Sequence, residues 1–198
     1  MSRRLSLTPA LLAPVAALAL GGCGLNSIPT AEENAKARWA DVQNEYQRRA
    51  DLVPNLVATV KGYAKQESSV LVGVTEARAK ATSIQVSADD LKDPSKLQQF
   101  GQAQGQLSAA LGRLLSVTEN YPDLKSNANF LALQSQLEGT ENRITIARRD
   151  YNASVQQYNT LIRTFPNSIG AKVFYGAKPM QTFQATAPNA QSAPTVNF

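Results

Sequence analysis

The chain has 198 residues, a formal net charge of +5 and no histidine. That length suits one ordinary domain with a single core. Without imidazole the chain lacks the Ser-His-Asp and Cys-His couples of nucleophilic hydrolases and the usual ligands of a catalytic zinc site. The composition therefore excludes the commonest hydrolytic mechanisms.

The first 25 residues have the layout of an export signal. Arg3 and Arg4 precede 21 consecutive uncharged residues (5–25), and two glycines stand immediately before Cys23. This order of basic, apolar and small residues is typical of a secretory signal. The cysteine resembles the site at which bacterial lipoproteins are diacylated and cleaved. We therefore expect residues 1–22 to be removed and Cys23 to carry the lipid anchor.

Two other interpretations of this segment stay open. Its 21 uncharged residues are close to the ~20 that span a bilayer, which would give a single uncleaved transmembrane anchor. A buried structural cysteine is the second alternative. In the lipoprotein interpretation, Gly24 favours the outer membrane of a Gram-negative cell, facing the periplasm, because aspartate there is typical of inner-membrane retention.

We expect no nucleic-acid partner. Cleavage before Cys23 would remove two arginines from a chain of formal charge +5 and leave +3. The chain also has no basic stripe interleaved with aromatic residues, which is the pattern typical of nucleic-acid binding.

A helical pattern follows a short polar tether, residues 23–30. Thr30 and Glu33 form a capping-box pattern, which starts a helix near Ala31. Apolar residues then recur every three or four positions, as on one face of an α-helix. They are Trp39, Val42, Tyr46, Val53, Leu56, Val60, Tyr63, Val70 and Val74.

Pro54 interrupts this pattern. A proline inside a helix removes one hydrogen bond and crowds the preceding turn, at a cost of ~3 kcal/mol. We therefore expect one helix over residues 31–52 and another over 54–84. A single helix kinked at the proline is the alternative.

Two more helices are predicted further along. Asp93-Pro94 is a cap followed by a proline suited to the first helical turn, and an apolar stripe continues from there to Tyr121. From 130 to 165, apolar residues fall seven apart in a coiled-coil-like seam. The seam consists of Phe130, Leu137, Ile144, Tyr151, Tyr158 and Phe165. Because residues 31–165 show no strand pattern, we expect an all-α fold, an up-and-down antiparallel bundle of four long helices, or three with the first kinked.

The composition changes at Pro166. Four of the ten prolines lie in the last 33 residues, and no acidic residue follows Asp150. We expect residues 166–198 to form an extended tail that Phe174, Phe183 and Phe198 pin to the bundle or to a partner. A surface tail without fixed structure is the alternative.

Several stretches of the chain resemble the LemA family of bacterial envelope proteins. They are 48–57 (RRADLVPNLV), 60–63 (VKGY), 121–125 (YPDLK), 137–144 (LEGTENRI), 147–152 (ARRDYN), 158–159 (YN), 165–166 (FP) and 194–198 (PTVNF). The resemblance covers nearly the whole mature chain. It implies a membrane-anchored helical bundle outside the cytoplasm with no established biochemical activity. The family usually has a plain N-terminal hydrophobic segment, so the lipoprotein-like cysteine is a departure.

One arginine falls on the apolar stripe of the first helix. A charge on a core face needs a partner, so we predict that Arg49 pairs with Glu141 or Asp51 and fixes the register between helices. The alternative is that Arg49 only extends its head to water. Glu138, Glu141 and Asp150 could suggest a metal, but a di-iron bundle also needs histidines. We therefore expect no metal site and no cofactor.

These features predict a non-enzymatic, membrane-anchored envelope protein. We expect no catalytic residues and a role as a structural or protein-interaction module with an envelope protein partner. A membrane-shaping role is the first alternative. A carboxylate-dependent hydrolase is the second, although a slender bundle offers no obvious cleft for a substrate.

Overall fold

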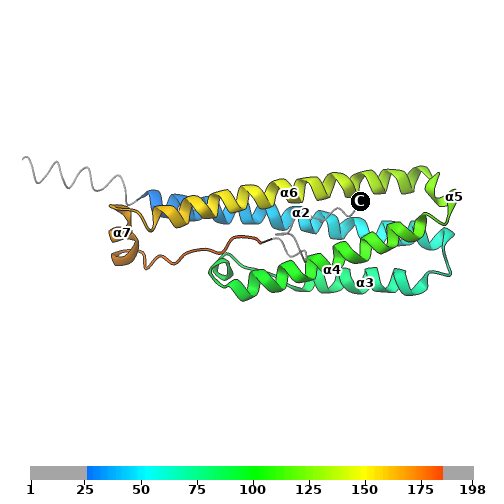
Figure 1. Ribbon diagram of the computed structural model, residues 1–198, viewed down its shortest axis with the longest axis horizontal. Helices are drawn as coiled ribbons and strands as arrows, with labels where there is room; N and C mark the ends of the chain where they lie inside the picture. The colour runs from blue at the N-terminus through cyan, green and yellow to red at the C-terminus, as the bar shows by residue number, and fades with distance from the viewer. Residues whose placement is uncertain (1–25, 185–198) are drawn as a thin grey trace, which may run out of the picture.

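The computed structural model describes residues 26–184, and this part of the chain forms a long helical rod with no strand (Figure 1). The four long helices are α2 (Ser27–Tyr63), α3 (Ser68–Ser83), α4 (Pro94–Thr118) and α6 (Ala128–Leu161). The short elements are η1 (Asp89–Lys92), α5 (Pro122–Lys125) and α7 (Asn167–Val173). Successive long helices run up and down the rod, so the predicted all-α bundle is confirmed.

α2 passes through Pro54 without a break, which corrects the predicted division into 31–52 and 54–84. Pro54 is exposed, while Val53 and Leu56 beside it are buried. Packing of these neighbours offsets the single hydrogen bond that the proline removes. The chain reverses instead at residues 64–67, where Glu67 N–H donates to the Ala64 carbonyl over 3.1 Å.

The start of α2 also differs from the prediction. The helix begins at Ser27, ahead of the expected start at Ala31. The Thr30 hydroxyl does not cap the helix but donates to the Asn26 carbonyl over 2.8 Å. A threonine one turn inside a helix makes this backward bond readily, so the capping-box prediction was wrong.

The predicted start of α4 at Asp93-Pro94 is confirmed. Asp93 is the N-cap, and its carboxylate accepts hydrogen bonds from Ser95 N–H over 2.8 Å and from the Ser95 hydroxyl over 2.7 Å. Pro94 occupies the first turn, where its missing N–H would have no helical partner.

We expect this cap to make stability depend on acid pH. The hydrogen bonds from the Ser95 hydroxyl and N–H hold the pKa of Asp93 below its ordinary value of 3.8. The folded state therefore favours the carboxylate, so the cap stabilises above about pH 4 and its contribution is lost as pH falls through the lowered pKa. Urea unfolding of wild type and Asp93→Ala should differ at pH 6 and converge in acid. The Asp93→Asn cap does not titrate, so a constant gap between wild type and Asp93→Asn from pH 6 to 2 would contradict this assignment.

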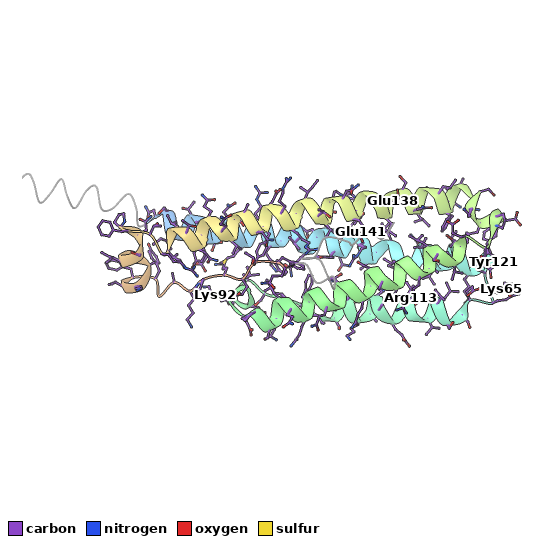
Figure 2. The ribbon with its side chains drawn as sticks, in the orientation of Figure 1. Lys65, Lys92, Arg113, Tyr121, Glu138 and Glu141 are labelled. Atoms are coloured by element: carbon purple, nitrogen blue, oxygen red, sulfur yellow. The ribbon has the colours of Figure 1, made fainter. Side chains whose placement is uncertain are left out.

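The core divides into two parts along the rod. In the part nearer α5, α2 and α6 pack on α3 and α4, and the buried residues include Leu56, Val60, Leu107, Leu114 and Phe130. At that end the Tyr121 hydroxyl donates to Glu67 Oε1 over 3.2 Å. This bond joins the turn between α4 and α5 to the turn between α2 and α3. Figure 2 labels Tyr121 and the neighbouring Lys65.

The part nearer α7 is covered differently. α2 and α6 extend beyond α3 and α4. In the part that α3 and α4 do not reach, η1 and the segment after α7 cover α2 and α6 instead (Figure 1). This half buries Trp39, Tyr46, Leu91, Phe100, Tyr151, Tyr158, Met180 and Phe183. Residues 162–184, beyond the last long helix, are therefore part of the fold.

The prolines led us to expect an extended segment after Pro166, but the structure corrects this prediction in part. Residues Asn167–Val173 form α7, since the span between Pro166 and Pro179 contains no further proline to interrupt a helix. α6 ends at Leu161. The last predicted seam residue, Phe165, therefore lies beyond the helix and is 80% exposed.

Candidate functional site

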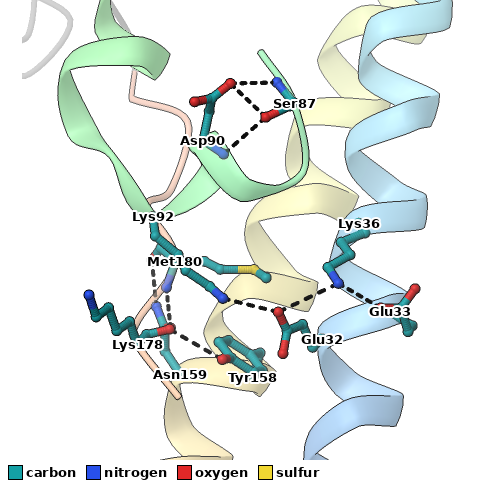
Figure 3. Close-up of polar contacts among 10 residues, drawn as sticks. All are labelled: Glu32, Glu33, Lys36, Ser87, Asp90, Lys92, Tyr158, Asn159, Lys178 and Met180. Carbon is teal, nitrogen blue, oxygen red and sulfur yellow. Dashed lines mark hydrogen bonds and ion pairs between the residues drawn. The ribbon is translucent and has the colours of Figure 1, made fainter. Parts of the chain in front are cut away.

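An extended segment after α7, residues 177–184, lies along α6. Side chains of α6 hold it by hydrogen bonds to its main-chain groups. We call it the strap. Asn159 Nδ2 donates to the Met180 carbonyl over 2.8 Å, and Met180 N–H donates to Asn159 Oδ1 over 2.9 Å. Asn152 repeats this pair with Phe183, over 2.9 and 2.7 Å. Figure 3 shows Asn159 and Met180 facing one another.

The spacing of the two asparagines matches the strap. Seven helical residues rise about 10.5 Å, and three extended residues span about 10 Å. The seven positions from Asn152 to Asn159 therefore place one side-chain amide opposite each end of the three-residue step from Met180 to Phe183. Each amide pairs with both main-chain groups of one strap residue, as a neighbouring strand would.

Two seam tyrosines complete these contacts. The Tyr151 hydroxyl donates to the Gln181 carbonyl over 2.8 Å, and the Tyr158 hydroxyl donates to the Lys178 carbonyl over 3.2 Å (Figure 3). Burial raises the pKa of both phenols, so both remain neutral donors near neutral pH. On the other side, Gln181 N–H donates to the Leu91 carbonyl of η1 over 2.8 Å.

Phe183 anchors the strap in the core. Its ring centroid lies 6.3 Å from each of the rings of Trp39, Tyr46 and Phe100. The Arg148 guanidinium lies 4.2 Å from the Phe183 ring centroid, within range of a cation–π interaction. Phe183 is therefore part of the bundle core rather than a side chain offered to a partner.

Reversing one donor should loosen the strap. In Asn152→Asp the carboxylate still accepts from Phe183 N–H, but the donor to the Phe183 carbonyl becomes a second acceptor. We expect a loss of about 1–3 kcal/mol in the free energy of strap opening, seen as faster exchange of the Phe183 and Met180 amides. Asn129→Asp, an exposed asparagine in the first turn of α6, is the control. Equal protection in both variants would rule out this role for Asn152.

Arg49 connects three helices at the boundary between the two core parts. It is 1% exposed. Its Nη1 donates to Glu141 Oε1 over 2.8 Å and to the Ser108 hydroxyl over 2.7 Å. Its Nη2 donates to the Gln104 side-chain oxygen over 2.6 Å and to the Gln104 carbonyl over 3.1 Å.

The Arg49 guanidinium lies beside an aromatic ring, and its ion-pair partner is partly exposed to solvent. Its carbon centre lies 5.0 Å from the Tyr46 ring centroid, and Nε is a buried donor without a partner in the structure. The Glu141 side chain is 45% exposed, so the pair is partly screened by solvent. Asp51, the other predicted partner, instead accepts from Gln47 Nε2 over 2.7 Å.

A groove between α4 and α6 lies over this network. Its volume is about 570 Å³, and the residues that line it include Arg49, Gln104, Glu141, Arg148 and Phe183. Figure 2 shows Glu141 on α6, one helical turn from Glu138. Among residues 26–184, no group of three or more acidic or cysteine side chains could hold a metal.

The other predicted site residues fall in different places. Phe174 is 70% exposed beside α7. Cys23 and Phe198 lie outside the described residues, so their predicted roles stay predictions. None of the helices in the described range is long and apolar enough to cross a bilayer.

Some residues of the site were not predicted from the sequence. Asn152 and Asn159 lie seven apart beside the seam of α6, and that spacing could have suggested a repeated contact. Gln104 and Ser108 lie in a polar stretch of α4, where nothing in the sequence distinguishes an arginine partner from a solvated side chain.

Comparison with known proteins places this sequence in a family. The sequence model of the LemA family matches residues 38–198. The chain belongs to the LemA family. It is 27% identical over 157 residues to magnetosome protein MamQ 2 of Paramagnetospirillum magneticum, and 26% identical to magnetosome protein MamQ of Magnetospirillum gryphiswaldense. Protein LemA of Metamycoplasma hominis is 30% identical over 121 residues.

These matches cover only part of the relatives. They include 71% of this LemA-family chain and 58% of each of the two magnetosome proteins. For the Metamycoplasma hominis protein the shares are 61% and 51%. The chain thus spans little more than half the length of these curated relatives.

Proposed function

We propose that this LemA-family protein is a membrane-anchored, non-catalytic interaction module of the cell envelope. The observation that carries the proposal is the position of the N-terminus of α2. Ser27 begins α2 at the α7 end of the rod (Figure 1), and the 21 uncharged residues 5–25 end two positions before it in the sequence. An anchor there would hold one end of the rod at the membrane and leave the bundle free to meet partners.

Lipid attachment at Cys23 is the form of anchor that we favour. The two glycines before the cysteine and the basic start of the chain support it. A single transmembrane segment in the same residues is the alternative. Both attach the bundle at the same end.

The anchor is tested by expressing wild type and Cys23→Ala in a Gram-negative host. We expect the membrane-bound wild type to have the mass of a chain starting at an acylated Cys23, and Cys23→Ala to be uncleaved or soluble. A Cys23→Ala product that stays in the membrane at the mature size would contradict lipid attachment. An uncleaved wild type would instead support the transmembrane alternative.

The interaction role is tested by gentle detergent extraction, affinity recovery and mass spectrometry. The full chain is compared with one ending at Gln184, which keeps the strap and Phe183 in the fold. A partner that is recovered only with the full chain would support an adaptor that uses residues 185–198. Recovery of the protein alone in both cases would oppose an interaction role.

A membrane-shaping role is the second candidate. It draws on the similarity between 71% of this chain and two relatives named magnetosome proteins. Anchored protein at high surface density should then deform or cluster liposomes. Unaltered vesicles under these conditions would leave the interaction role as the better proposal.

A further inference from the structure

The short helix α7 exposes its large apolar side chains and buries its small ones. Gly170 and Ala171 are the buried residues of this helix. Ile169 and Val173, one turn apart, are 58% and 69% exposed. A helix on the surface of a water-soluble bundle normally turns its large apolar side chains toward the core, so this orientation is the reverse of the usual one.

Three aromatic residues extend this apolar surface. Phe165 and Phe174 are 80% and 70% exposed, and Tyr175 is 45% exposed. We call the five exposed residues the tip surface: Phe165, Ile169, Val173, Phe174 and Tyr175. Apolar side chains gathered in this way indicate a binding surface. Tyrosine is favoured where lipid meets water, and phenylalanine is typical of the apolar face of helices that bind at this interface.

The charges around the tip surface are basic. Arg163, Lys172 and Lys178 are exposed, and the chain has no acidic residue after Asp150.

The acidic residues that α2 brings to this end are already paired. Glu32 contacts Lys36 and Lys92, and Glu33 contacts Lys36 (Figure 3). The free charge beside the tip surface is therefore positive, which complements an anionic partner.

The position of the tip surface limits what that partner is. α7 and the first residue of α2 lie at the same end of the rod (Figure 1). The uncharged stretch 5–25 precedes that residue in the sequence. If this stretch or a lipid on it enters a membrane, the tip surface is the part of the bundle nearest the bilayer.

We propose that the tip surface docks on an anionic lipid bilayer, with its apolar side chains in the interface and its three cations at the headgroups. This inference rests on the proposed membrane anchor and adds a second contact to it. Each Lys or Arg near an anionic surface contributes favourably to binding, and aromatic and aliphatic side chains add apolar burial. Two contacts at one end would hold the rod at a fixed angle to the membrane.

The test places a fluorescent reporter at the tip of the full-length protein. Phe174→Trp is reconstituted in phosphatidylcholine–phosphatidylglycerol vesicles whose acyl chains carry bromine, which quenches tryptophan on contact. Leu131→Trp, an exposed apolar position (50%) near the α5 end of α6, is the matched control. The native Trp39 is 2% exposed in the core and gives a constant background in both variants. Circular dichroism confirms that each variant is folded, and flotation measures anchoring separately.

We expect both variants to float with the vesicles and only the tryptophan at position 174 to be quenched. Flotation without quenching at position 174 would overturn the docking while the anchor stands. Equal quenching at positions 174 and 131 would show a rod lying flat and would overturn docking by its end. Failure to float would reject the anchor and the docking together.

Two further arms identify what the tip surface recognises. Adding Ile169→Ser and Val173→Ser to Phe174→Trp should abolish the quenching, and replacing phosphatidylglycerol by phosphatidylcholine should weaken it. Unchanged quenching in either arm would overturn the recognition proposed here. A blue shift of the tryptophan emission that grows with protein concentration without lipid would instead show that a second copy covers the surface.

Discussion

Replacing Phe183 by alanine should destabilise the bundle by about 3 kcal/mol, near the lower end of the range for buried phenylalanine. The ring is 7% exposed and contacts the aromatic cluster of Trp39, Tyr46 and Phe100. Its removal leaves a cavity and also takes the ring from under Arg148. For a domain of this size the melting temperature should fall by roughly 10 °C.

The same variant should release the strap locally. Without the ring, the strap near residue 183 is held only by hydrogen bonds to its main-chain groups. The backbone amides of residues 180 and 183 should therefore exchange faster, and this increase should exceed any increase in α3. Phe174→Ala, at a 70% exposed phenylalanine, is the control and should change stability by less than about 0.5 kcal/mol. Equal losses in the two variants would show that the strap does not contribute to the core.

Replacing Arg49 by methionine should cost about 3 kcal/mol, because it removes a charged donor from buried polar groups that then lack a partner. The guanidinium satisfies two acceptors of buried Gln104 as well as Glu141 and Ser108. A methionine fills much of the same space but leaves the Gln104 oxygens without this donor. Lysine should restore only part of the stability, because one ammonium does not reproduce the two-pronged contact.

Denaturant unfolding of Arg49→Met beside Arg48→Ala provides the check. Arg48 is the exposed neighbour on the same helix, so its loss should have little effect. Glu141→Gln keeps an acceptor but removes the charge at a half-exposed site, so we expect about 1 kcal/mol or less. A melting temperature of Arg49→Met equal to that of Arg48→Ala would mean that the buried arginine does not support the fold.

Most of the helical content was predictable because it depends on a local pattern. The apolar stripes of α2, α4 and α6 recur with helical spacing, and the Asp93-Pro94 pair marks a helix start chemically. The turn at residues 64–67 (AKQE) contains neither glycine nor proline, so nothing in the sequence set it apart. Pro54 was the stronger local signal, but burial of its neighbours outweighs its cost.

The site was predictable only where a residue conflicted with its surroundings. Arg49 stood out because a charge interrupts an apolar stripe, and the structure places it beside Glu141. The roles of Asn152 and Asn159 depend on where the chain goes after α7, which no periodic pattern encodes. Phe183 could be assigned either to the bundle or to a partner until the path of the strap was known.

The hydrogen bonds of Asn152 and Asn159 place different constraints on the composition and the length of the strap. Asn152 and Asn159 form these hydrogen bonds with main-chain groups of Phe183 and Met180, so the bonds do not select side chains there. Exposed strap positions such as Thr182 can therefore change during evolution at little cost. An inserted or deleted residue between Met180 and Phe183 would instead misalign one amide pair and displace the aromatic ring, so the number of residues in this step is constrained even where the identity of an exposed residue is not.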